Sequence, residues 1–482
     1  MDLTELFNKY ELIPRVYDEM YKKEEIRNPY KTIFENLTKI SREELEKKQE
    51  LAKILFMSQG ITFTVYSSGE GIEKIFPFDL IPRIITSDEW TFLEKGIRQR
   101  IIALNLFLKD IYNQQFIIQD GIIPARLIYS SPNYLKEMDR LKVPHDIYLH
   151  ISGIDLIRDG DGEFYVLEDN LRTPSGVSYM LENREITKRI FPDLLPKCDV
   201  KPVMDYPSLL YRNLVSLSPR SIEKPVIVLL TPGIFNSAYF EHTTLARLMG
   251  VELVEGRDLL VDNHIVYMKT TQGLQQVDVI YRRVDDEYLD PLVFNPDSTL
   301  GVSGLMSAYR KGNVNIINAV GNGVADDKAI YSYVPDMIRY YLNEEPILHN
   351  VPTYHLEKDD DRNYVFEHIE KMVIKRTNGS GGYGMLMGNQ SSPEEIEFYK
   401  NEVLKDTRQF IAQPIIDIST APCFLNGKVQ PRRVDLRPFA LYGPNGIDIV
   451  PGGLTRVALK EGSLVVNSSQ GGGSKDTWVL AH

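Results

Sequence analysis

The spacing of apolar residues changes along the chain and predicts a mixture of helices and strands. Over the first ~55 residues, apolar positions such as Leu6, Tyr10 and Leu12 recur at helical spacing among many Glu and Lys residues. Residues 61–80 instead alternate and cluster as short strands do, and residues 90–112 return to helical spacing. We therefore expect an amphipathic helical arm that packs against a mixed lobe.

Two alternating apolar stretches between residues 150 and 170 flank the sequence Asp159-Gly-Asp-Gly162. Because Asp-Gly supplies residues that adopt positive φ, this pattern predicts an antiparallel hairpin. Such a hairpin can bring Asp155 opposite Glu168 and Asn170, which share one face of the second strand. Two carboxylates and one amide suit Mg2+ if nucleotide phosphates and waters complete its coordination. A solvated acidic hairpin is the alternative.

A βαβ pattern occupies the middle of the chain. The expected elements are a strand at 226–230, a helix at 238–249 and strands at 251–254 and 277–281. This succession predicts a small open α/β domain.

The sequence from Val373 to Gly384 predicts a strand, a glycine loop and a second strand, with Lys375 on the first strand. The loop contains four candidate phosphate contacts, Gly379, Ser380, Gly381 and Gly382. Backbone amides in such a loop can approach phosphate oxygens because no side chain intervenes. The lysine precedes the glycines, so this is not a Walker A loop, and a plain hairpin is the alternative to a nucleotide site.

A further apolar strand at residues 410–415 is interrupted by a glutamine and a proline. Such a segment suits a hinge that offers hydrogen bonds to an adenine edge, with Gln413 and Ile415 as candidate contacts. An edge strand of a sheet would show the same pattern.

Composition narrows the classes of function. The length of 482 residues suggests roughly two to four domains, and 43% hydrophobic with 25% charged residues is typical of a globular protein. A net charge of -12 without any basic run argues against nucleic-acid binding and against an anionic membrane surface. No apolar stretch is long enough to span a membrane, and the first residues lack a signal pattern, so we expect a cytoplasmic location.

These motifs together resemble those of the circularly permuted ATP-grasp family, in particular of its glutathionylspermidine-synthase-like members. Asp155, followed by Glu168 and Asn170, is similar to the metal-binding segment of the family, and residues 171–175 are similar to its Thr-Pro-Ser segment.

The nucleotide-binding positions of the family also have counterparts here. Lys328 and Lys375 resemble the two lysines that bind ATP, and Gln413 resembles the hinge glutamine. Ordinary ATP-grasp enzymes place the metal-binding segment after the lysines, whereas here it precedes them.

The resemblance implies an α/β fold with α+β elements, namely a circularly permuted ATP-grasp fold with a small Rossmann-like domain and a helical N-terminal arm. The expected parts are the arm (1–58), a lobe with the metal-binding segment (59–222), the Rossmann-like pre-ATP-grasp domain (223–318), a nucleotide lobe with the lysines and the glycine loop (319–418) and the remainder of the C-terminal lobe (419–482).

The resemblance also implies a ligase that uses ATP and Mg2+ to join a small-molecule or peptide carboxylate to an amine through an acyl phosphate. An arginine would stabilise the oxyanion, with Arg437 as the first candidate and Arg456 and Arg283 as the others, whereas Arg172 is expected nearer the phosphates. Each of these arginines could instead form an ordinary salt bridge. The sequence does not indicate an oligomeric state.

One position departs from the family pattern. The glutathionylspermidine synthetases have an arginine two residues before the first metal-binding aspartate, where this chain has Gly153. Another cation must therefore activate the substrate, or the activation differs, and no motif demands glutathione or spermidine.

Two other functions stay open. A phosphotransferase of this fold would pass phosphate through a histidine, for which His145, His150 and His242 are candidates, although none lies in a phospho-acceptor motif. A non-catalytic ATP-binding protein would be expected to have lost one of the lysine or metal positions, and all of these are intact.

Overall fold

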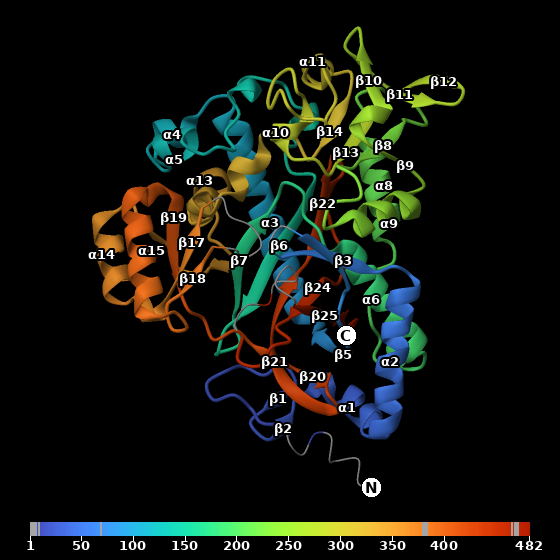
Figure 1. Ribbon diagram of the computed structural model, residues 1–482, viewed down its shortest axis with the longest axis vertical. Coiled ribbons are helices and arrows are strands. Elements are labelled where there is room, and N and C mark those ends of the chain that lie inside the picture. Colours follow the sequence, from blue (N-terminus) through green and yellow to red (C-terminus); the bar gives the residue numbers. More distant parts are fainter. Residues whose placement is uncertain (1–6, 8–9, 68–69, 378–383, 464–465, 467–471) are drawn as a thin grey trace.

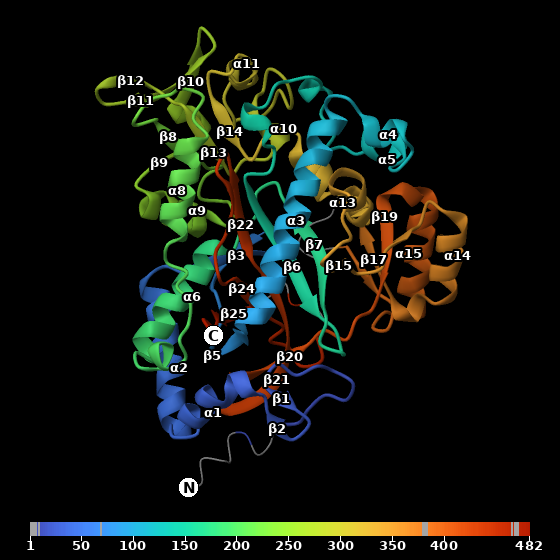
Figure 2. The ribbon, with the colours of Figure 1, turned by 180° about the vertical axis from the view of Figure 1, so that it is seen from behind.

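A computed structural model describes residues 7, 10–67, 70–377, 384–463, 466 and 472–482 (Figure 1). In these residues a central mixed sheet is surrounded by helices and by smaller sheets, and the same arrangement is seen from behind in Figure 2. Within the described part of the chain, no helix combines the length and the apolar character needed to cross a membrane.

The central sheet joins strands from both ends and from the middle of the chain. Its ten described strands are β5 (Phe78–Ile85), β6 (Ile151–Arg158), β7 (Phe164–Asn170), β15 (His349–Asn350), β20 (Thr420–Leu425), β21 (Lys428–Arg437), β22 (Phe439–Gly443), β23 (Gly446–Ile449), β24 (Leu454–Val457) and β25 (Gly473–Val479). The order is β15-β7-β6-β21-β24-β25-β5, with β20 paired to β21 and with β22 paired to β6 and β23.

The predicted hairpin is confirmed as β6 and β7. Asp155 pairs with Glu168 and Gly153 pairs with Asn170 across the two strands. At the turn, the Asp159 carboxylate accepts the backbone N–H group of Gly162, which has φ 96°. The hairpin register therefore sets the predicted metal-binding residues at one end of the two strands.

The predicted α/β unit is confirmed as a four-stranded parallel sheet of order β14-β13-β8-β9. Its strands are β8 (Ile227–Leu230), β9 (Glu252–Val254), β13 (Val279–Arg282) and β14 (Asn315–Ile317), and its helices are α8 (Tyr206–Ser216), α9 (Tyr239–Met249), α10 (Asp286–Leu289) and α11 (Leu305–Arg310). A three-stranded sheet of β10 (Leu259–Asp262), β11 (Ile265–Thr270) and β12 (Gly273–Gln276) follows β9 in the chain. All of these strands fall within 223–318, although the boundaries of the parts stay a prediction.

A third sheet carries Lys375 and Gln413. Its antiparallel strands are β16 (Tyr354–His355), β17 (Met372–Arg376), β18 (Leu386–Met387) and β19 (Phe410–Pro414), and helices α14 (Asp359–Glu367) and α15 (Pro393–Lys405) accompany it. Because β19 pairs with β17 on one side and β16 on the other, the alternative of an edge strand for residues 410–415 is wrong.

The longest helix, α3 (Ser87–Ile111), starts at a capping box between Thr86 and Glu89. One large apolar cluster packs α3 against β6 and β7, and another packs α2 and α6 against β5. The remaining elements are α1 (Lys31–Leu37), α2 (Arg42–Ser58), α4 (Phe116–Gln119), α5 (Ala125–Tyr129), α6 (Val177–Ile190), α7 (Leu194–Lys197), α12 (Lys328–Tyr331), α13 (Val334–Leu342), β1 (Tyr21–Lys22), β2 (Glu25–Ile26), β3 (Thr62–Ser67) and β4 (Glu70–Ile75).

The N-terminal arm is helical only in its second half, in α1 and α2. The described residues 10–30 hold no α-helix, so the helical spacing at Tyr10 and Leu12 was misleading there. The reason is a long-range contact: the Thr420 N–H donates to the Tyr17 carbonyl, and the Glu19 N–H donates to the Thr420 carbonyl. These backbone groups pair with β20 and are not available for a helix.

Candidate active site

A polar cavity of about 200 Å3 lies where the end of β7, the segment after it and the start of α12 meet. Both signs of charge line it. Five of the residues singled out in the sequence lie in its wall, namely Glu168, Asn170, Arg172, Lys328 and Arg437. The structure therefore brings metal, lysine and arginine candidates from three distant segments to one place.

Lys328 forms an ion pair with Glu168 in the wall of this cavity. The Lys328 Nζ lies 2.6 Å from the Glu168 Oε1. Burial lowers the pKa of Lys328, but the Glu168 carboxylate outweighs it and raises the pKa overall. Burial likewise raises the pKa of Glu168, and Lys328 outweighs it and lowers that pKa. Asp327 caps α12 by accepting the Ala329 N–H, which fixes where Lys328 begins the helix.

Asp155 is buried beside two arginines. Its carboxylate oxygens accept from the Arg437 Nε and Nη2 at 2.5 and 2.8 Å, and from the Arg456 Nη2 at 2.7 Å. Burial raises the pKa of Asp155, but the two guanidinium groups outweigh it and lower the pKa to about 2. Arg456 is also held by Asp435, whose Oδ1 lies 2.9 Å from its Nε.

The metal candidates differ in how well they fit Mg2+. Glu168 and Asn170 line the cavity, and the buried Asn170 Nδ2 has no hydrogen-bond partner in the described residues. Asp155 does not line it, and both of its oxygens already accept from guanidinium groups. The described residues hold no group of three or more His, Cys, Asp or Glu that could bind a metal. One carboxylate and one amide fit Mg2+ only together with phosphate oxygens and water.

Lys375 and Gln413 lie on the other side of Glu168, where they line a smaller space together with Lys328. The Lys375 Nζ donates to the Gln413 Oε1 at 2.7 Å, and the Gln413 Nε2 donates to the Thr353 Oγ1 at 3.0 Å. Burial lowers the pKa of Lys375 to about 8.

Ile415, the other nucleotide candidate in the segment of Gln413, does not line either of these spaces. The Ile415 N–H donates to the Lys371 carbonyl, so its backbone amide is already paired and does not face an adenine site. The loop candidates Gly379, Ser380, Gly381 and Gly382 lie outside the described residues and stay a prediction.

The four candidate arginines separate into two pairs. Arg437 and Arg172 line the cavity, and the Arg172 Nε lies 2.7 Å from the Asp326 Oδ2. Arg456 and Arg283 do not line it. Arg283 is buried, donates to the Pro174 carbonyl at 2.7 Å and pairs with Glu241 at 3.2 Å. It therefore acts as a positioning residue for the segment that precedes α6.

Gly153, where the glutathionylspermidine synthetases have an arginine, is closely packed in the structure. A Cβ atom at this position would lie 3.2 Å from the Arg437 Cδ and 3.2 Å from the Pro174 Cβ. The aliphatic part of Arg437 and Pro174 therefore pack directly over Gly153, so a larger residue at this position would displace Arg437.

Three residues at the site were missed from the sequence. Asp326 stands two residues before Lys328, and Asp435 stands two residues before Arg437, so their closeness in sequence to candidate residues was an available signal. Thr353 orients Gln413 but had no such signal. It directly precedes β16 and lies 60 residues from Gln413 in the chain.

The histidine candidates lie elsewhere. Among the described residues that line the cavity there is no histidine. His145 is exposed, burial lowers the pKa of His150 to about 3, and the His242 Nδ1 lies 2.8 Å from the Thr231 Oγ1. These placements disfavour phosphate transfer through a histidine.

Comparisons with known proteins agree with this arrangement. Residues 82–458 match the family described as circularly permuted ATP-grasp type 2. An uncharacterized protein of Synechocystis is 54% identical over 441 residues, which are 92% of each chain. An uncharacterized protein of Mycobacterium tuberculosis is 50% identical over 98% of this chain and 86% of its own length.

A longer relative and a solved structure extend the comparison. A Frankia casuarinae protein named putative glutamate–cysteine ligase is 39% identical over 98% of this chain, but over 54% of its own length. A glutathione synthetase-like effector of Globodera pallida has a TM-score of 0.59 at 10% identity, over 91% of this chain and 98% of that one, which shows a shared fold. The hairpin that carries Asp155 and Glu168 precedes both lysines, and the family match covers most of the length, so the chain belongs to the circularly permuted ATP-grasp family.

Proposed function

We propose that this chain is an ATP- and Mg2+-dependent ligase that joins a carboxylate to an amine through an acyl phosphate. The observation that carries the proposal is the meeting of Glu168, Lys328 and Arg437 around one polar cavity. Family membership supports the use of ATP. The name of the Frankia relative points to the same class of reaction, although this chain corresponds to 54% of that protein.

In this proposal the two lysines bind the phosphates of ATP. On ATP binding, the Lys328 ammonium group would contact a phosphate oxygen in place of Glu168. The Lys375 ammonium group would contact a phosphate oxygen in place of the neutral amide of Gln413. Mg2+ held by Glu168 and Asn170 would neutralise charge on the transferring phosphoryl group. Arg172, restrained by Asp326, faces the same phosphates.

The reaction then has two steps. An oxygen of the substrate carboxylate attacks the γ-phosphorus, and ADP leaves with the electrons of the broken P–O bond. The amine attacks the carboxyl carbon of the acyl phosphate, inorganic phosphate leaves, and the nitrogen releases its proton to water. Arg437, which lines the cavity with an 11% exposed side chain, stabilises the oxyanion of the second step.

Glu168→Ala tests the proposal. Without this carboxylate, ADP release should fall at least about 100-fold, the scale of losing one electrostatic contact with the transition state. The matched control is Glu163→Ala, which removes an exposed carboxylate from the same hairpin and should leave ADP release unchanged. Circular dichroism checks that both variants fold. Undiminished ADP release by a folded Glu168→Ala protein would sink the assignment of this site.

A further inference from the structure

One carboxylate in the polar cavity of the candidate active site has no role in the chemistry proposed above. Three acidic side chains line this cavity, namely Glu168, Asp285 and Asp326. Glu168 pairs with Lys328, and Asp326 pairs with Arg172. Within the part of the chain that the structure describes, no hydrogen bond or ion pair reaches the Asp285 carboxylate. This carboxylate is therefore available to a ligand in the cavity.

Asp285 comes from the α/β unit, at the carboxyl edge of its parallel sheet. It stands three residues after the end of β13 and directly before α10. In the order β14-β13-β8-β9, the chain continues from β8 to β9 on one side and from β13 to β14 on the other. Open α/β sheets bind ligands outside the carboxyl ends of their strands at such a point. Here that point borders the polar cavity through Asp285.

The Asp285 side chain is not used to cap the helix that follows it. Asp285 is the N-cap residue of α10, with φ -68° and ψ 155°, and its side chain makes no capping hydrogen bond. An aspartate at this position commonly accepts a backbone N–H group of the first turn. The next carboxylate, of Asp286, pairs at 2.9 Å with the buried Arg282, which also donates to the Val284 carbonyl at 2.9 Å. A buried side chain thus holds the backbone next to Asp285, whose own carboxylate stays unpaired.

Charge decides which substrate this carboxylate suits. In the proposed reaction the phosphates and the substrate carboxylate are anions, and the cations of the site meet them, namely Lys328, Lys375, Arg172 and Arg437. A further carboxylate in the same cavity repels those anions. The amine brings the opposite charge, because a primary amine, like that of lysine, is mostly protonated near neutral pH.

A metal ion is the other cation that a carboxylate here could attract. Among the described residues no group of three or more His, Cys, Asp or Glu could hold a metal, so the three carboxylates of this wall do not converge on one ion. Asp285 is exposed, whereas Glu168 and Asp326 are half-buried. Asp285 therefore lies nearest to solvent of the three, on the side from which a second substrate enters.

We propose that Asp285 binds the amine substrate as its ammonium ion and so selects a charged amine as the nucleophile. Asn133, Thr173 and Ser175 line the same cavity and offer neutral oxygens to the other N–H groups of the ammonium ion. The bound ammonium ion releases one proton to water and attacks the carboxyl carbon as the neutral amine. Phosphate leaves, and the nitrogen releases a second proton. The proposal rests on the proposed ligase function, because the amine attacks the acyl phosphate.

Two kinds of nucleophile separate amine binding from the rest of the reaction. Hydroxylamine is mostly uncharged near neutral pH and traps an acyl phosphate as a hydroxamate without the need for an ammonium site. Butylamine, diaminobutane and glycinamide are mostly protonated there. Each is supplied with Mg·ATP and a pool of amino acids and short peptides as carboxylates, and mass spectrometry quantifies hydroxamate and amide.

The variants change the charge at one position. Asp285→Asn removes the charge and keeps the shape, and Asp285→Glu keeps the charge. The control is Glu287→Gln, because Glu287 is an exposed carboxylate of the same helix that does not line the cavity.

We expect Asp285→Asn to raise the KM for the amine about tenfold, the scale of losing a hydrogen bond to a charged group. Hydroxamate formation and the Mg2+ requirement should stay as in the wild type. Asp285→Glu should recover a large part of the amine binding, and Glu287→Gln should match the wild type. An unchanged KM for the amine in Asp285→Asn, an equal loss of hydroxamate and amide, a raised Mg2+ requirement, or hydroxamate without any amide in the wild type would overturn the proposal.

Failure of the ligase gives a different result. A wild type that forms neither hydroxamate nor amide contradicts the proposed reaction, and equilibrium dialysis of the same amines then decides amine binding by itself. Retention by the wild type and by Glu287→Gln, with loss in Asp285→Asn, would support the role of Asp285. Equal retention by all of them, or no retention, would refute it.

Discussion

Lys328 and Lys375 have the same proposed role but different electrostatic surroundings. Lys328 has a carboxylate within 2.6 Å, which raises its pKa. Lys375 has a neutral amide at 2.7 Å, and burial lowers its pKa to about 8. Lys375 is therefore the cation whose charge changes just above neutral pH.

ATP binding should accordingly weaken as the pH rises above about 8. Phosphate oxygens favour the charged ammonium group, so the pKa of Lys375 is higher in the complex than in the free protein. Between these two pKa values, the Kd for ATP should rise up to about tenfold per pH unit. Calorimetry from about pH 7.5 to about pH 9.5 measures this slope, and Lys375→Arg, which stays charged, should flatten it. A wild-type Kd that does not change with pH contradicts the assignment.

Spacing in the sequence located some site residues and not others. Asp155 and Glu168 could be paired in advance because an Asp-Gly turn fixes a hairpin register. The places of Arg283 and Arg456 could not, because they depend on Glu241 and Asp435, and partner choice across the fold leaves no periodic signal. This is why two of the four arginine candidates turned out to support the site and not to line it.

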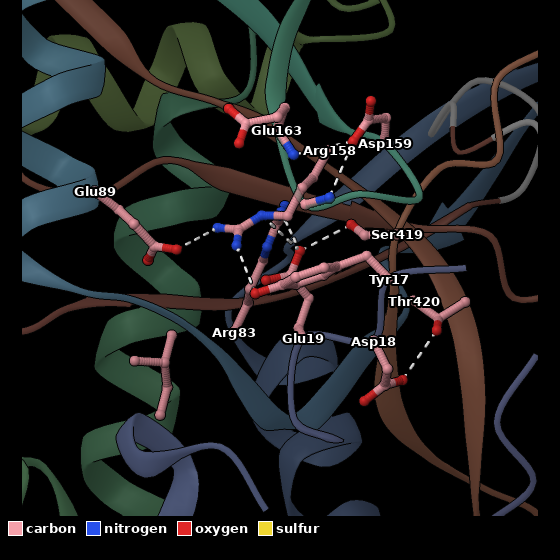
Figure 3. A network of polar contacts seen from close by, with 12 residues as sticks. Tyr17, Asp18, Glu19, Arg83, Glu89, Arg158, Asp159, Glu163, Ser419 and Thr420 are labelled. Atoms are coloured by element: carbon pink, nitrogen blue, oxygen red, sulfur yellow. Dashed lines mark hydrogen bonds and ion pairs between the residues drawn. The ribbon is translucent and has the colours of Figure 1, made fainter. Parts of the chain in front are cut away.

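Among the elements, the N-terminal arm shows how a distant contact overrides a local pattern. Glu19 is buried, and its Oε1 accepts from the Arg83 Nη2 at 2.6 Å and from the Ser419 Oγ at 2.8 Å (Figure 3). The Arg158 Nε lies 3.5 Å from the same oxygen, and its guanidinium group also pairs with Glu89. The arm is thus joined by charge to β5, β6 and α3.

Glu19→Gln should destabilise the protein strongly. The change leaves two buried guanidinium groups without their shared carboxylate, which costs about 3–5 kcal/mol of unfolding free energy. Denaturant titration measures this loss. Glu24→Gln, which changes an exposed glutamate in the same arm, is the control and should stay within about 0.5 kcal/mol of the wild type. Equal stability of the two variants would show that the network does not anchor the arm.

For the whole molecule, the permuted order was visible in the sequence but the central sheet was not. The hairpin and the βαβ unit are local, so their turns and periodicity predicted them. The parallel pairing of β25 with β5 joins Ser474 to Phe78, and no local pattern encodes a contact across such a separation. Two strands that lie far apart in the chain, β5 and β25, are therefore neighbours within one sheet.

Removal of residues 473–482 should prevent folding. It withdraws β25 from between β24 and β5 and with it Trp478, which is fully buried. Two strand edges would then be open, so we expect an insoluble or unfolded product. Soluble yield and circular dichroism measure the outcome, with removal of the exposed His482 alone as the control. A soluble, folded product of the longer deletion would contradict this account of the sheet.

The central claim is that phosphate from ATP is passed to a carboxylate. The most direct measurement supplies Mg·ATP, a pool of 18O-carboxylate-labelled amino acids and short peptides, and polyamines, and then analyses the phosphate and the amides by mass spectrometry. The account predicts one labelled oxygen in inorganic phosphate for each ADP, together with a new amide. Unlabelled phosphate, or AMP in place of ADP, would contradict it.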